Sequence, residues 1–445
     1  MFLDSGSVAP TDSTWPILAD PRHSIEVECP GGGFAGRLDH QDASCPSVRE
    51  VGLDAGTRAT RLLAGPRGRA LCAAIAGLDG FHLLRALDRP TSGVVLEAVG
   101  AQDAGRPGWP PTGWEALRRR AREAGAHPPL APSEVLARAV AAVDLTVLVE
   151  VRDELTLLPS LVDAVDGVMF SGDEELTREV LGSAADALVP VAEALARAPG
   201  AAWWWSPCDK GTQRWIRFSS GPERPPLAGA REALVDWARS ETDYEARSAG
   251  LVPFPPRGNS PRYSGTWWST PPYRCLLRTT RGLPGLPAVG LALVDDGPPD
   301  DAVTVWEVSP SPHTKVFEVD GPGAWCELTE RFPREVTLSR RHDWWRWTGW
   351  EGRWFLPDWV QVADVFDAVH LSVAGHLEAS YRALPVSGGA TCLTGFDPDE
   401  TVWLADVVTD ARLVEHREGG IGANRFHDSV RPWLGGGLSG GGLGG

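Results

Sequence analysis

Residues 334–377 read REVTLSRRHDWWRWTGWEGRWFLPDWVQVADVFDAVHLSVAGHL, and the interpretation of the whole chain depends on this stretch. It contains six of the 20 tryptophans of the chain: Trp344, Trp345, Trp347, Trp350, Trp354 and Trp359. Between residues 334 and 353 five arginines stand against three acidic residues, a local charge of +2 in a chain whose formal net charge is −17. A cationic island in an acidic protein attracts anionic ligands.

Two structures are compatible with so many neighbouring tryptophans. In the first, they line a pocket for a flat anionic ligand, because a guanidinium both stacks on rings and forks onto carboxylate or phosphate. The ligand-binding residues would then be Arg340, Arg341 and Arg346 for charge, with Trp345 and Trp347 for stacking. In the second, the rings form a second core with arginine stems lying over them, and no cavity exists.

Residues 367–373 predict a buried β-strand, with Val369 and Leu371 on one face and His370 on the other. His370 is the best general-base candidate in the chain, because an unperturbed imidazole titrates close to neutral pH. Asp367 is its expected acid–base partner. The alternative is a structural histidine, which is the more frequent role of a single histidine on a strand.

The chain is too long, at 445 residues, for one compact core. The hydrophobic patterns predict an α+β protein, with an α-rich N-terminal half and a mixed-strand α+β C-terminal domain. The expected segments are a loop-rich opening over 1–57, an α-rich domain over 58–249, a Trp/Arg-rich α+β domain over 250–409 and a flexible tail over 410–445.

Local signals place individual elements within these segments. Helices are predicted over 183–198, with Pro190 starting or kinking it, over 228–248 and over 322–331, which opens on a proline. Strands are predicted over 288–294, 302–308, 315–319, 335–339, 390–394 and 400–408. The two tryptophan runs 202–207 and 266–271 also appear strand-like.

Residues 65–69 (GPRGR) precede an Ala-rich helix. Loop amides and arginines at a helix N-terminus can hold an anion. The alternative is an ordinary turn with solvated arginines. The glycine spacing is not that of a P-loop or of a dinucleotide-binding fingerprint.

The net charge of −17 opposes binding to nucleic acid or to an anionic membrane. The seven cysteines are scattered without a C-x-x-C pair, which argues against a disulfide framework and a zinc site, so no metal is predicted. The chain shows neither a signal-peptide pattern nor an apolar run long enough to cross a membrane. A cytoplasmic location is therefore predicted, and the sequence suggests no cofactor.

The segments LLAGPRGRALC, YSGTWWSTPP, EVTLSRRHDWWRWTG and PDWVQVADVFDAVHLSVAGHL resemble a group of Trp-rich proteins of high-GC bacteria, a likeness that implies no activity. A more distant resemblance is to ADP-ribosyltransferases, whose residue order is followed by Arg262, Ser269-Thr270 and then Glu318 or Asp367. The resemblance implies that Arg262 holds NAD phosphates, that Ser269 braces the pocket and that the carboxylate stabilises an oxocarbenium-like state. The chain lacks the E/Q-x-E pair of that family.

Two functions follow as expectations. The first is a protein, such as a transferase, that binds an anionic, ring-bearing ligand such as a nucleotide or NAD. The second is a non-catalytic module that binds another protein through its Trp/Arg surface, since both residue types are enriched in interface hot spots.

Overall fold

The computed structural model describes residues 53–78, 80–88, 130–165, 172–218, 221–250, 266–272, 275–294 and 302–418, all within one compact unit that spans residues 52–445. The greater part of the predicted loop-rich opening, Arg262 and the chain after residue 418 lie outside the described residues. Within the described ranges, no helix has the length and apolar character needed to cross a membrane.

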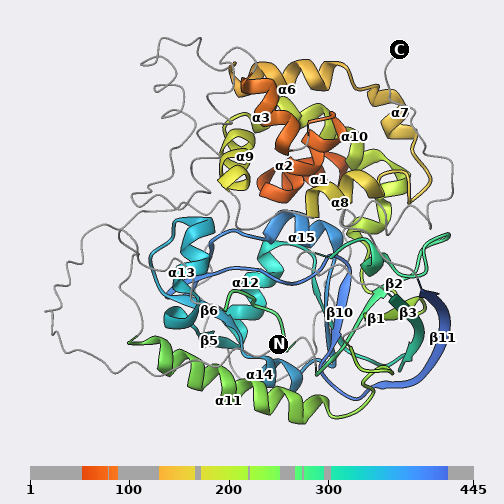
Figure 1. The fold of residues 1–445 in the computed structure, drawn as a ribbon, viewed down its shortest axis with the longest axis vertical. Coiled ribbons are helices and arrows are strands. Elements are labelled where there is room, and N and C mark those ends of the chain that lie inside the picture. Colours follow the sequence, from red (N-terminus) through yellow and green to blue (C-terminus); the bar gives the residue numbers. More distant parts are fainter. Residues whose placement is uncertain are drawn as a thin grey trace, which may run out of the picture. The chain divides into compact units, whose positions relative to one another are not determined.

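Helices dominate the first part of the described chain (Figure 1). They are α1 (Ala55–Ala64), α2 (Pro66–Ile75), α3 (Gly80–Asp88), α6 (Pro132–Ala141), α7 (Leu145–Glu150), α8 (Leu158–Val165), α9 (Gly172–Ser183) and α10 (Val189–Arg197). Local chemistry sets several of their starts: the side chain of Asp54 caps α1, and Pro190 stands in the first turn of α10 as predicted.

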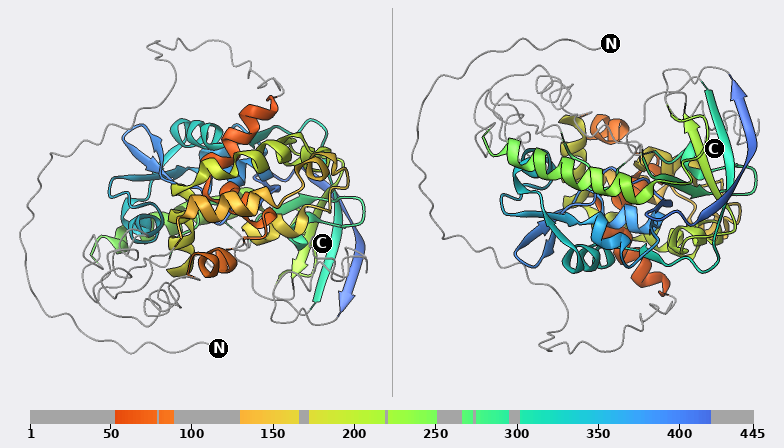
Figure 2. Two further views of the ribbon diagram at one scale, coloured as in Figure 1. Left: turned by 90° about the horizontal axis from the view of Figure 1, so that it is seen from above. Right: turned by 90° about the horizontal axis from the view of Figure 1, so that it is seen from below.

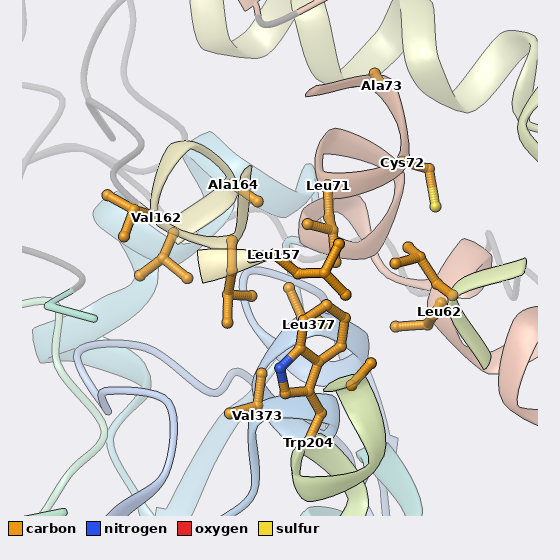
Figure 3. Close-up of a cluster of buried hydrophobic side chains, with 14 of the residues drawn as sticks. Leu62, Leu71, Cys72, Ala73, Leu157, Val162, Ala164, Trp204, Val373 and Leu377 are labelled. Atoms are coloured by element: carbon orange, nitrogen blue, oxygen red, sulfur yellow. The ribbon is translucent and has the colours of Figure 1, made fainter. Parts of the chain in front are cut away.

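The core of these helices includes side chains from the C-terminal half. Leu62 of α1 and Leu71 of α2 are fully buried in one cluster with Trp204, Val373 and Leu377 (Figure 3). The last two residues belong to α15 (Val373–Ala379), which packs against α1 and α2. The helical part therefore shares its core with the segment that follows the predicted His370 strand.

A seven-stranded sheet has the order β11-β3-β1-β2-β10-β7-β4. Its strands are β1 (Gln213–Phe218), β2 (Leu277–Arg281), β3 (Ala302–Pro310), β4 (Val316–Val319), β7 (Ala368–Leu371), β10 (Glu400–Trp403) and β11 (Val408–Glu418). Neighbouring strands are antiparallel except for β4 and β7. Because β1 lies between β2 and β3, the sheet takes strands from both sides of the predicted boundary at residue 250.

The second half adds a smaller sheet and four helices. The sheet has the order β5-β6-β9-β8, from Pro333–Glu335, Trp354–Pro357, Gly389–Thr391 and Leu384–Val386. The helices are α11 (Ala230–Ser248), α12 (Pro322–Arg331), α13 (Thr337–Thr348) and α14 (Trp359–Ala363). The long green helix α11 in Figure 2 lies against α13 and α14. The α+β class is confirmed, with most helices in the first half and most strands in the second.

Several local predictions were wrong. The chain forms 3-10 helices at Pro199–Trp205 and Val289–Leu291, where strands were expected, and Pro199 stands in the first turn of the former. The expected strand over 335–339 stops at Glu335 because α13 begins two residues later. The predicted flexible tail begins inside β11, whose residues pair with β3 as far as Glu418.

Candidate functional site

The central tryptophan-rich stretch forms a helix and a second core. Helix α13 ends at Gly349, whose positive φ of 74° suits a helix C-terminus, and its residues Trp344 and Trp347 are buried. Trp344 packs edge-to-face on Trp354 with ring centroids 5.1 Å apart, and Trp347 packs in the same way on Tyr381 at 5.1 Å. The rings thus cover one another, and Trp347 does not offer the open stacking face that the sequence predicted.

The arginines of α13 do not converge on one point either. Arg340 is buried and makes a 2.6 Å ion pair with Glu241 of α11. Arg341, Trp345 and Arg346 are half-buried and have interactions of their own. Helical periodicity turns successive side chains around the axis, so neighbours in sequence separate in space. No helix was predicted over Thr337–Thr348, so this separation was not expected.

Two other predicted site residues have structural roles. Ser269 is fully buried, and its hydroxyl accepts a hydrogen bond from the amide of Thr394 at 3.0 Å and donates to that residue's carbonyl at 3.2 Å. Asp367 accepts from the amide of Lys315 at 2.8 Å. The period of two in a strand turns Asp367 to the face opposite His370, so Asp367 does not orient the imidazole.

His370 is instead the centre of a charged quartet, defined as the half-buried Glu318 and the buried His370, Asp399 and Arg281. Its Nδ1 lies 2.5 Å from a Glu318 oxygen and its Nε2 lies 3.3 Å from Oδ1 of Asp399. Arg281 donates to Asp399 through Nε at 2.5 Å and through its backbone amide at 2.8 Å. The amide of Cys208 donates to the other Glu318 oxygen at 3.0 Å. Strand register explains the meeting, because Glu318 of β4 faces His370 of β7 directly.

The electrostatics of the quartet oppose a general-base role. Burial alone would lower the pKa of His370, but the charge of Glu318 and the hydrogen bonds to Asp399 and Glu318 raise it to about 9. Both ring nitrogens face carboxylates, so the imidazolium has no lone pair for a substrate. Burial, reinforced by Glu318 and Asp399, raises the pKa of the Cys208 thiol to about 12, which keeps this cysteine protonated.

A second group of charged side chains consists of three arginines. We call Arg69 of α2, Arg178 of α9 and Arg382, which follows α15, the arginine cluster. Arg69 donates to the carbonyls of the last two residues of α1 at 2.8 and 3.2 Å. Arg178 donates to the carbonyl of Trp347 at 2.7 Å, and Arg382 to that of Glu378 at 2.8 Å. Burial, together with the charges of Arg382 and Arg178, lowers the pKa of Arg69.

Buried polar groups of α15 lie beside the arginine cluster. Glu378 is 1% exposed; one of its oxygens accepts from Nε of Arg61 at 2.7 Å, while the other has no hydrogen-bond partner. Burial raises the pKa of Glu378 to about 7 against the opposing charge of Arg61. His376 is fully buried, and burial with the charge of Arg67 lowers its pKa to about 3, so its ring is neutral.

The sequence contained a signal for one member of the cluster only. Arg69 belongs to the GPRGR element, for which an anion-binding role was an open alternative. Arg178 lies in an ordinary helical pattern and Arg382 follows a short helix, so neither attracts notice in the sequence. Across the described ranges, no group of three or more His, Cys, Asp or Glu side chains is arranged to hold a metal ion.

The chain was compared with protein families, curated proteins and solved structures. No family model matches the chain, and no curated protein or solved structure matches it.

Proposed function

We propose that this protein binds an anionic ligand at the arginine cluster formed by Arg69, Arg178 and Arg382. The observation that carries the proposal is that two arginines from other elements, Arg178 and Arg382, act electrostatically on the half-buried Arg69. The two neighbouring side-chain charges that act on Arg69 are both positive. An oxyanion placed among the three would offset this repulsion, and a guanidinium fork is shaped for carboxylate or phosphate.

The main competing explanation is that these arginines are simple helix caps. Each of them donates to a carbonyl in the last turn of a helix, and a helix C-terminus carries roughly half a negative charge. The partial charges of three such ends amount to about 1.5, about half of the formal charge of three guanidinium groups. The charge of Glu378 also acts on Arg382. A guanidinium has five N–H donors, and Nε of Arg69 is buried without a hydrogen-bond partner.

The ligand class expected here is an oxyanion that carries several oxygen atoms, such as a phosphate ester, and includes the nucleotides and NAD suggested by the sequence. The surrounding rings restrict how a base would bind. Trp347 and Tyr381 pack edge-to-face on each other and are 6% and 4% exposed. Recognition would therefore depend on the charged end of the ligand, and the cluster would discriminate weakly between ring systems.

Titration calorimetry with inorganic phosphate, ATP and NAD tests the proposal. At least one of them should bind the wild-type protein and raise its melting temperature by mass action. Arg69→Gln should weaken that binding by about 1–3 kcal/mol, because it removes charge-assisted hydrogen bonds. The matched control is Arg231→Gln, which removes an arginine of α11 from an exposed ion pair with Asp364. Equal losses in both variants, or no binding at all, would overturn the proposal.

A second candidate function is the protein-binding module. Trp268 favours it, because this side chain is 39% exposed although the neighbouring Trp267 packs edge-to-face on Trp347. Exposed tryptophan is typical of interface hot spots. The two candidates separate cleanly: Trp268→Ala should leave anion binding unchanged if the arginine cluster is the site.

A further inference from the structure

We propose that anion binding at the arginine cluster is coupled to protonation of Glu378, so that the site binds its ligand more tightly as the pH falls. This inference rests on the proposed function and adds a regulation to the same site.

The position of Glu378 connects it with the cluster. Arg382 donates to the backbone carbonyl of Glu378 at 2.8 Å, and its charge also acts on the Glu378 carboxyl. The carboxyl itself is almost fully buried, with one oxygen held by Arg61 and the other left without a partner. A buried carboxylate with an unsatisfied oxygen is costly, and a proton removes most of that cost.

The charges that act on the Glu378 carboxyl are those of Arg61, Asp320 and Arg382. Helix α1 supplies Arg61, whose other contact is the carbonyl of Asp320 ahead of α12. Helix α2 carries Arg67, whose charge acts on the neutral His376, and Arg69, which interacts with Arg382. Gly321 permits this approach, since a side chain there would collide with both Arg61 and the Glu378 carboxylate.

The coupling follows from charge balance. In the free protein, Arg61 and Arg382 favour the ionised carboxyl, while burial and Asp320 oppose it, and the pKa of Glu378 is about 7. An anion beside Arg382 would add negative charge near Glu378 and occupy a cation that stabilised its ionised form. The pKa of Glu378 should therefore rise on binding, and reciprocity requires that the protonated protein binds the anion more tightly.

Sulfate is the appropriate probe, because unlike phosphate it does not titrate between pH 6 and 8.5. A pKa rise of about one unit would make the dissociation constant for sulfate about sevenfold lower at pH 6 than at pH 8.5, at constant ionic strength. Calorimetry in buffers of different ionisation enthalpy should detect uptake of roughly 0.4 proton per sulfate at pH 7.

Two variants identify the group. Glu378→Gln keeps an acceptor for Arg61 and mimics the protonated state, so its affinity should be constant across pH and equal to the wild-type value at pH 6. Asp320→Asn removes a charge that raises the pKa of Glu378, so the midpoint of the pH dependence should move to lower pH.

The outcomes distinguish this inference from the proposed function. Sulfate binding without proton uptake, or an unchanged pH dependence in Glu378→Gln, would overturn the coupling and leave the anion site standing. A wild-type protein that binds neither sulfate nor phosphate at any pH would overturn both. If Glu378→Gln fails to fold, proton uptake by the wild type decides alone.

Discussion

The charged quartet around His370 and the arginine cluster differ in whether their formal charges cancel. In the quartet two carboxylates, Glu318 and Asp399, alternate with an imidazolium and Arg281, so the formal charges cancel. In the arginine cluster three cations act on one another; a helix carbonyl accepts from each of them, and the charge of Glu378 also acts on Arg382. Opposite charges that are buried together stabilise each other, and removal of one of them destabilises the fold. Like charges that lie together are tolerated where water or a ligand compensates them. The quartet therefore fits a structural role and the cluster a binding role.

The largest expected effect comes from removing one negative charge from the quartet, which tests its structural role. Asp399→Asn should lower the free energy of unfolding by about 3–5 kcal/mol, because it leaves Arg281 and His370 with an excess of buried positive charge. Asparagine suits the test, since Asp399 has a φ of 61° and asparagine tolerates that conformation. Denaturant unfolding measures the loss.

The matched control is Asp364→Asn. It removes a carboxylate from an exposed pair with Arg231, in which the side chains are 57% and 54% exposed, and should change the free energy of unfolding by at most about 1 kcal/mol. Similar effects of Asp399→Asn and Asp364→Asn would mean that the quartet is no more structural than a surface pair.

The pH dependence of stability gives the next largest effect. The pKa of His370 is raised from 6.5 to about 9, so its contribution is fully present below pH 6.5 and is lost as the pH rises through 9. The loss should amount to about 3 kcal/mol between these limits. Because Glu318 is the strongest of the influences that raise this pKa, Glu318→Gln should flatten the decline. An equally steep decline in Glu318→Gln would assign the titration to another group.

The smallest effect on stability should come from the arginine cluster. Arg69→Gln loses two contacts to helix carbonyls but relieves repulsion with Arg178 and Arg382, so the free energy of unfolding should change by less than about 1 kcal/mol. Saturating anion should then stabilise the wild type and leave Arg69→Gln unaffected in thermal unfolding. A loss as large as that of Asp399→Asn would make the cluster a structural element like the quartet.

Local patterns in the sequence were reliable where one short-range cause dominates. The prolines in the first turns of α10 and α12 stand as predicted. Alternation along β7 also placed His370 on the face opposite Val369, which packs in the core. These signals act over a few residues, and the tertiary structure does not override them.

The candidate site could not be predicted from such local patterns, because it depends on contacts between residues far apart in the sequence. Nothing near His370 in the sequence indicates Glu318 or Asp399, whose positions follow from strand pairing. Arg69 and Arg382 meet because α15 packs onto α2. The prediction from the tryptophans failed for a related reason. Their number suggested a binding surface, but the positions of their side chains depend on α13 being a helix.

The place of β1 in the large sheet has a consequence for attempts to dissect the molecule. A gene cut at codon 250 would yield one half carrying β1 without its partners and another with a gap between β2 and β3. Each product would present bare strand edges that match the other half, so the two pieces suit reassembly by complementation better than separate study.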